Sequence, residues 1–191
     1  MHYLHSMYYF VIFAIILLGA ALRAPALFDA FWVDEVWSLK IAQSVSSPLE
    51  IFTSIHHDNN HMLNTLFLYL LGDQSQWFIY RFPSFLFGMG SIVLAGIIAH
   101  RRGQWEAATA MLLFSFSYPM ILYSTEARGY SPAVFFALLA FLLINHYRNT
   151  TQWRHIVLFW GTTVLGFLSH LSFAIVYLAF VAWILVSTQK Q

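Results

Sequence analysis

Five long apolar runs constrain the fold of this 191-residue chain more than any other feature. They cover roughly residues 8–22, 82–100, 107–123, 132–147 and 155–187. A helix needs about 20 mostly apolar residues to cross a bilayer, so each of the first four runs can cross once. The last run is too long for one crossing and must fold back, with a turn near Ser169 and His170. The runs predict an all-α, polytopic membrane protein with about six transmembrane helices.

Composition supports this class of protein. Charged residues make up 9% of the chain, whereas soluble domains contain about 25%. The chain has no cysteine, which excludes disulfides and thiolate metal sites. The N-terminal run lacks a basic leader and a small-residue cleavage site, so we expect it to be retained as the first helix. We expect one transmembrane domain over residues 1–191, surrounded by membrane lipid and without a nucleic-acid partner.

Charge placement predicts the orientation. Basic residues between spans gather at one set of span ends: Arg101, Arg102, Arg148 and Arg154. The positive-inside rule assigns that side to the cytoplasm. The other side receives most of the acids and one long segment, residues 23–80. Within it the apolar run 62–72 is too short to cross, and a crossing there would invert every later span. We therefore expect two interfacial helices in this external segment and both termini inside.

Several polar groups that are hard to place in a membrane fall on the external face. Asp34 and Glu35 lie in FWVDEVWSLK, shortly after the first span. A charge in a bilayer core costs about 3 kcal/mol or more, so this pair must reach water or a partner. The cluster HHDNNH precedes the short apolar run, Arg81 enters the second span, and EARGY follows the third.

Each feature also has a purely structural interpretation. Asp34 and Glu35 can be a solvated loop pair, and Arg81 can extend its side chain to the headgroup region. Glu126 and Arg128 can form an exposed salt bridge of little energetic value. The loop histidines can be merely polar, or they can bind a metal ion. Because the features converge on one membrane face, a functional site is favoured.

Carboxylates beside arginines at the bilayer surface suit transfer from a lipid-linked phosphate. A carboxylate can accept the proton of an acceptor hydroxyl as a general base. Guanidinium groups bind phosphate through two parallel hydrogen bonds, and they stabilise the charge that develops on the leaving phosphate. A transporter or channel subunit is a competing class. It predicts polar residues in mid-span, where this chain has only a few hydroxyls.

Four stretches, in order, resemble motifs of the GT-C glycosyltransferases, polytopic enzymes that use polyprenyl-phosphate sugars. Their first-loop Asp-Glu motif is similar to FWVDEVWSLK, and the His-Pro-Pro-type element that follows is similar to HDNNHMLNTLFLYLLG. The Arg-x-Pro-Ser start of the second transmembrane helix is similar to YRFPSFLFGMGSIVL, and the Tyr-Ser-x-Glu-Ala-Arg-x-Tyr entry to the fourth is similar to YSTEARGYSPAVFFALLAFLL. The likeness covers nearly the whole chain. It is strongest to the bacterial group related to protein O-mannosyltransferases and lipid A aminoarabinose transferases.

The resemblance implies roles for individual residues. Asp34 would be the principal catalytic carboxylate, assisted by Glu35, and the sugar would be transferred with inversion. The substrate- and phosphate-binding set would be Arg81, Arg128, Glu126, His61 and Tyr130. Arg81 and Arg128 would then meet in one region beside Asp34, with Glu126 pairing one guanidinium. A divalent metal, if one takes part, would have Glu35, His57 and His61 as its candidate ligands.

Two departures from the family pattern matter. Met62 and Leu63 stand where prolines would follow the motif histidine. Family members also have many more spans, so we expect the C-terminal part of the family fold to be absent or supplied by a partner chain. The predicted function is a glycosyltransferase, or its N-terminal module, acting on a polyprenyl-phosphate sugar donor at the periplasmic face of a bacterial inner membrane. The alternative is a non-catalytic prenyl-phosphate-binding or assembly subunit of the same fold.

Overall fold

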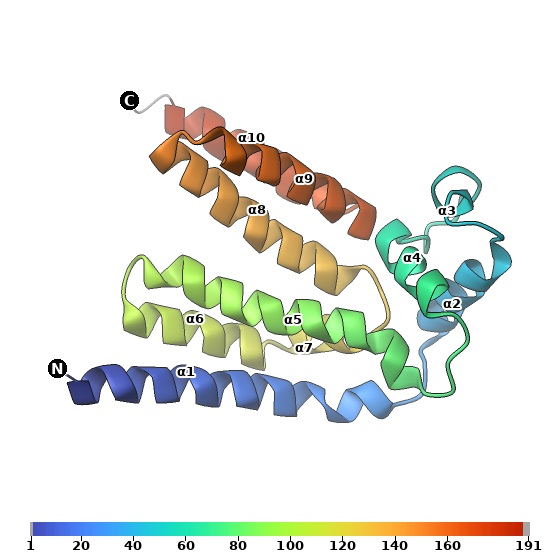
Figure 1. The fold of residues 1–191 in the computed structure, drawn as a ribbon, viewed down its shortest axis with the longest axis horizontal. Coiled ribbons are helices and arrows are strands. Elements are labelled where there is room, and N and C mark those ends of the chain that lie inside the picture. The colour runs from blue at the N-terminus through green and yellow to red at the C-terminus, as the bar shows by residue number, and fades with distance from the viewer. Residues whose placement is uncertain (1, 189–191) are drawn as a thin grey trace.

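The computed structural model describes residues 2–188, with side chains from residue 7 to residue 186. Within that range the chain forms helices and no strand, which confirms the all-α prediction. The elements are α1 His2–Arg23, the 3-10 helix η1 Pro25–Phe28, α2 Val33–Ser44, α3 Glu50–Thr53, α4 Met62–Leu71, α5 Trp77–His100, α6 Gln104–Phe116, α7 Tyr118–Thr125, α8 Tyr130–Thr150, α9 Trp153–Ser169 and α10 Phe173–Thr188 (Figure 1).

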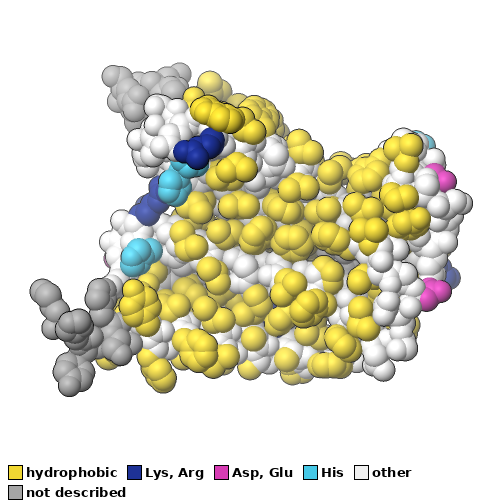
Figure 2. Space-filling model, in the orientation of Figure 1, with side chains coloured by type: hydrophobic (Ala, Val, Ile, Leu, Met, Phe, Trp, Pro, Cys, Tyr) yellow, Lys and Arg dark blue, Asp and Glu magenta, His cyan; other side chains and the backbone are white. Residues whose placement is uncertain are grey.

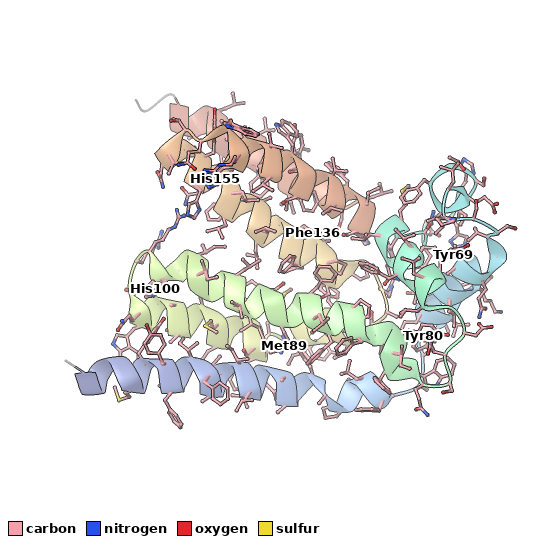
Figure 3. All side chains as sticks on the ribbon, viewed as in Figure 1. Tyr69, Tyr80, Met89, His100, Phe136 and His155 are labelled. Atoms are coloured by element: carbon pink, nitrogen blue, oxygen red, sulfur yellow. The ribbon has the colours of Figure 1, made fainter. Side chains whose placement is uncertain are left out.

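The long helices lie side by side, and the short helices α2, α3 and α4 gather at one end of the bundle (Figure 1). One core forms where α1, α5 and α6 meet, around Ile15, Ile92 and Met111. A second core joins α4, α8 and α10 through Leu63, Phe136 and Phe173 (Figure 3 labels Phe136). The outer surface in Figure 2 is mostly apolar, and the charged and His side chains gather at its two ends. This distribution is typical of a membrane-embedded bundle.

Three helical segments are long and apolar enough to cross a membrane: Met7–Phe28, Trp77–His100 and Tyr130–Thr150. The bent pair α6 and α7 would make a fourth span. The last apolar run divides as expected, because α9 ends at Ser169 and α10 begins at Phe173. These two helices have 17 and 16 residues, fewer than the roughly 20 that a straight crossing needs. Six crossings therefore remain a prediction.

Residues 107–123, expected to form one span, are instead divided at Ser117 into α6 and α7, which meet at an angle of 61°. The cause is Pro119 in the first turn of α7. Proline lacks the backbone N–H that would continue the helix, and its ring clashes with the carbonyl four residues earlier. The break leaves carbonyl groups at the end of α6 without helical partners.

The side chain of Arg23 supplies those partners. Its Nη2 donates to the carbonyl of Phe114 at 3.1 Å and its Nη1 to the carbonyl of Ser115 at 3.2 Å. Its Nε donates to Ser124 Oγ at 2.8 Å, and the residue is only 1% exposed. Arg23, which the sequence analysis placed in the external segment, is thus part of the bundle interior.

The segment expected to hold two interfacial helices contains α2 and α4, with the short α3 between them. Helix α4 ends at Gly72, whose φ of 62° lies in the left-handed region that favours glycine. The turn into α5 is held by Tyr80 (labelled in Figure 3), whose hydroxyl donates to the Gly72 carbonyl at 2.9 Å and accepts from the Gln74 N–H at 2.7 Å. The segment is therefore folded tightly against the end of the bundle.

Candidate functional site

The adjacent carboxylates Asp34 and Glu35 take opposite positions. Both lie in the first turn of α2, where successive side chains point about 100° apart. The Glu35 side chain is fully buried, whereas that of Asp34 is 54% exposed. Glu35 Oε2 also accepts the Trp32 backbone N–H at 2.9 Å, which caps the start of the helix. The two adjacent acids therefore lie in different environments.

Glu35 forms a buried, two-point ion pair with Arg81. Arg81 Nε donates to Glu35 Oε1 at 2.8 Å, and Arg81 Nη2 donates to Oε2 at 2.7 Å. The remaining guanidinium N–H groups donate to backbone carbonyls of Ala26, Leu27, Asp29 and Ala30. Arg81 is 1% exposed, and all three of its side-chain nitrogens are engaged. In this arrangement the pair ties α2, α5 and the η1 segment together.

The same pair fixes the loop between α7 and α8. The Ala127 backbone N–H donates to Glu35 Oε1 at 2.7 Å, and the Ala127 carbonyl accepts from Asn64 Nδ2 at 2.9 Å. Gly129 allows this loop to approach α9, because a Cβ there would lie 1.8 Å from the Ser169 carbonyl oxygen. Contacts with Glu35, Asn64 and α9 therefore hold this loop in place next to Arg128, the candidate functional residue that it carries.

Arg128 faces Asp34 at the protein surface. Its Nη1 lies 3.1 Å from Asp34 Oδ2 and 3.7 Å from Glu126 Oε2. Its Cζ lies 4.7 Å from the centre of the Tyr130 ring, a cation–π distance. Arg128 Nε is buried and has no hydrogen-bond partner. The structure thus brings Asp34, Arg128 and Glu126 together, whereas Arg81 pairs with Glu35.

Glu126 is 8% exposed, and its environment opposes ionisation. Burial is the largest effect and raises the pKa of this carboxyl group above its usual value, while Arg128 acts in the opposite direction. The 3.7 Å separation is too long for a hydrogen bond of normal geometry. Glu126 is therefore a weak partner for Arg128, whose closest acid is Asp34.

A stack of rings forms the adjoining wall. The rings of His61 and His170 lie 4.6 Å apart, and the ring of Tyr130 lies 4.4 Å from His170. His61 Nε2 is buried and has no hydrogen-bond partner. Burial, with smaller contributions from His170 and Arg128, lowers the pKa of His61 from 6.5 to about 4. The imidazole is consequently neutral at pH 7.

These groups surround an open pocket of about 380 Å³. Its lining residues are Asp34, Trp37, His57, Asp58, Asn59, His61, Arg128, Tyr130 and His170. Of the predicted site residues, Glu35, Arg81 and Glu126 do not line it. Trp37 also lines it, although it was not among the predicted site residues. Trp37 could have been found as the aromatic residue three positions after Asp34 on the same helix face.

The candidate metal ligands do not form a set. Glu35 is engaged by Arg81, and His57 Nδ1 lies 3.0 Å from Asp58 Oδ1. Within residues 2–188 no group of three or more His, Asp or Glu side chains is arranged to hold a metal ion.

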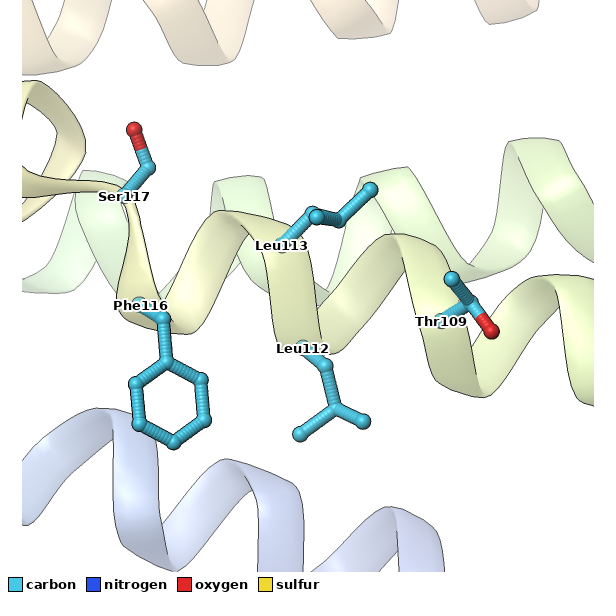
Figure 4. Close-up of a pocket in the computed structure, with 5 residues that line it drawn as sticks. All are labelled: Thr109, Leu112, Leu113, Phe116 and Ser117. Atoms are coloured by element: carbon cyan, nitrogen blue, oxygen red, sulfur yellow. The ribbon is translucent and has the colours of Figure 1, made fainter.

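A larger pocket, of about 640 Å³, lies elsewhere, on α6. Figure 4 shows its lining, which is Thr109, Leu112, Leu113, Phe116 and Ser117. Leu113 and Phe116 are well exposed, and the pocket has no ionisable side chain. Its apolar lining suits contact with lipid chains and not the chemistry of the polar pocket.

Comparison of the chain with protein-family models, characterised proteins and solved structures finds no match.

Proposed function

We propose that this chain is a membrane glycosyltransferase, or the N-terminal module of one, that transfers a sugar from a polyprenyl-phosphate donor at the external membrane face. The observation that carries the proposal is the pairing, in the lining of one pocket, of an exposed carboxylate with an arginine. Asp34 Oδ2 and Arg128 Nη1 are 3.1 Å apart, and both residues line the pocket. The motif order noted above, which resembles that of GT-C enzymes, supports the same assignment.

The proposed reaction uses each group once. Arg128 binds the donor phosphate, which competes with Asp34 for the guanidinium and so releases the Asp34 carboxylate. Asp34 then accepts the proton of the acceptor hydroxyl, whose oxygen attacks the anomeric carbon. The bond from that carbon to the phosphate oxygen breaks, and its electron pair leaves with the polyprenyl phosphate. Arg128 stabilises the charge that this phosphate gains.

The surrounding residues would support these steps without taking part in bond changes. Glu35 and Arg81 hold the loop that carries Arg128, through the Ala127 N–H. The ring stack of Tyr130, His61 and His170 offers a neutral surface on which a sugar ring can lie. This assignment modifies the roles implied by the family resemblance, because it gives Arg81 a positioning role beneath the pocket.

The test separates binding from transfer, using a polyprenyl phosphate for binding and the corresponding polyprenyl-phosphate hexose for turnover. Asp34→Asn is expected to retain binding and to lose about a hundredfold to ten-thousandfold in hexose release, the usual effect of losing a general base. Arg128→Gln is expected to weaken binding about tenfold to a hundredfold, corresponding to the 1.5–3 kcal/mol of a hydrogen bond to a charged group. Arg128→Lys should recover only part of that loss.

Asp73→Asn is the matched control, because Asp73 is an exposed acid of the same segment that bonds Gln43 outside the pocket. It should leave both measurements unchanged. Binding without hexose release in the unaltered chain would favour the non-catalytic subunit. Normal turnover in Asp34→Asn would remove Asp34 from the mechanism.

A further inference from the structure

The end of the bundle opposite the pocket carries a separate group of cationic and imidazole side chains, here termed the basic end. It consists of His100, Arg101, Arg102, His146, Arg148, Arg154 and His155. These residues come from the end of α5, the turn into α6, the end of α8 and the start of α9. In Figure 2 the Lys, Arg and His side chains form a row across this end, directly beside apolar surface.

Side-chain contacts join the two turns of the basic end. Arg101 Nη2 lies 2.9 Å from His146 Nδ1, and the rings of His146 and His155 lie 5.5 Å apart. His155 Nδ1 is in turn 3.2 Å from Thr150 Oγ1. This contact positions the guanidinium without placing an acidic side chain beside it. Figure 3 labels His155 at this end of α9.

The positive charge of the basic end is not balanced by acids. Among the described residues, none of its four arginines forms an ion pair with Asp or Glu. All four are exposed. The Cζ atom of Arg148 lies 4.7 Å from the Trp183 ring centre. This contact holds the Arg148 side chain in place but does not neutralise its positive charge. Glu106 is the one acid in the adjoining turn. A phosphate would therefore meet several oriented donors and little repulsion.

Exposed indoles place the basic end at headgroup depth. Trp105 and Trp153, in the first turns of α6 and α9, are 64% and 69% exposed. Tryptophan favours the boundary between hydrocarbon and headgroups. The basic end thus lies where the phosphates of lipids lie, while the apolar surface that begins beside it faces the acyl chains.

We propose that the basic end binds the phosphate of an anionic glycerophospholipid. Arg101 and His146 form the centre of the site, and Arg148 flanks it. Arginine binds phosphate through two parallel donors, and basic pockets at the cytoplasmic ends of transmembrane helices suit anionic headgroups. The acyl chains add contact with the adjoining apolar surface, which a soluble phosphate cannot make. This site is separate from the pocket that contains Asp34 and Arg128, and it holds whether or not that pocket transfers a sugar.

The experiment uses the purified full chain in a neutral detergent, titrated with phosphatidylglycerol or phosphatidylcholine and followed by native mass spectrometry. Phosphatidylglycerol is expected to bind more tightly, and the preference should fall as salt is raised. Arg101→Gln and Arg148→Gln are each expected to weaken phosphatidylglycerol binding about fivefold, since one cation near a membrane surface contributes about 1 kcal/mol. Lys40→Gln, which removes one exposed cation from the opposite end, should have no effect.

Three results would overturn the proposal. Equal affinity for the two lipids would show that the headgroup charge is not recognised. An equal loss in Lys40→Gln would show attraction to net charge and not to this site. Displacement of the lipid by millimolar inorganic phosphate would show a site for free phosphate.

Discussion

At the scale of single residues, Asp34 and Glu35 belong to the same sequence motif but differ sharply in burial. Asp34 is half exposed beside Arg128, whereas Glu35 is fully buried against Arg81. Charges as deeply buried as Glu35 are tolerated only when they are paired and hydrogen-bonded. Glu35 meets this requirement with hydrogen bonds from Arg81, Trp32 and Ala127. In the proposed mechanism Glu35 accordingly holds the site in place, and Asp34 acts in it.

This assignment predicts a sharp difference in stability between two conservative variants. Glu35→Gln leaves the buried Arg81 without a counter-charge and is expected to cost about 3–5 kcal/mol, the usual cost of breaking a buried pair from one side. Asp34→Asn changes an exposed pair and should cost at most about 1 kcal/mol. Thermal unfolding in detergent, followed by tryptophan fluorescence, measures both. Similar midpoints for the two variants would contradict the structural role of Glu35.

At the scale of elements, the break between α6 and α7 and the burial of Arg23 belong together. Pro119 interrupts the helical hydrogen bonds, and the Arg23 side chain donates hydrogen bonds to the carbonyl groups that lose their helical partners. A buried carbonyl without a partner costs about 1–3 kcal/mol. One arginine on α1 thus makes a bent element tolerable inside an apolar bundle.

Removing the hydrogen bonds that Arg23 donates to the end of α6 should destabilise the bundle. Arg23→Met keeps an apolar side chain of similar reach but leaves the carbonyls of Phe114 and Ser115 unpaired, so we expect a loss of about 2–4 kcal/mol. Lys40→Met, at an exposed position of α2, should change stability by about 0.5 kcal/mol or less. The unfolding midpoint in detergent is again the measurement. A stable Arg23→Met protein would show that the broken helix end finds other donors.

At the scale of the whole molecule, the separation of charge along the bundle predicts its orientation. Since the chain has no cysteine, single cysteines report accessibility without background. Ser54→Cys, after α3, should react with a membrane-impermeant thiol reagent applied from outside. Asn149→Cys, near the end of α8, should react only after the membrane is permeabilised. Labelling of both positions from the same side would contradict the predicted topology.

The sequence by itself determined the helical class, most helix positions and the grouping of polar residues at one end. These follow from interactions within a few turns, such as apolar periodicity, the turn at His170 and the glycine that ends α4. The break at Pro119 was not predicted, because the run that contains it was expected to form one span.

Only the tertiary structure decided which polar residues line the pocket. Glu35 meets Arg81 across 46 positions of sequence and Ala127 across 92, and Arg23 reaches Phe114 across 91. Neighbouring residues such as Asp34 and Glu35 have the same local surroundings, so no local pattern can tell which one turns inward. That choice depends on which helices pack against α2, because the desolvation cost of burying a charge is offset only where a distant segment supplies a charged or hydrogen-bonding partner.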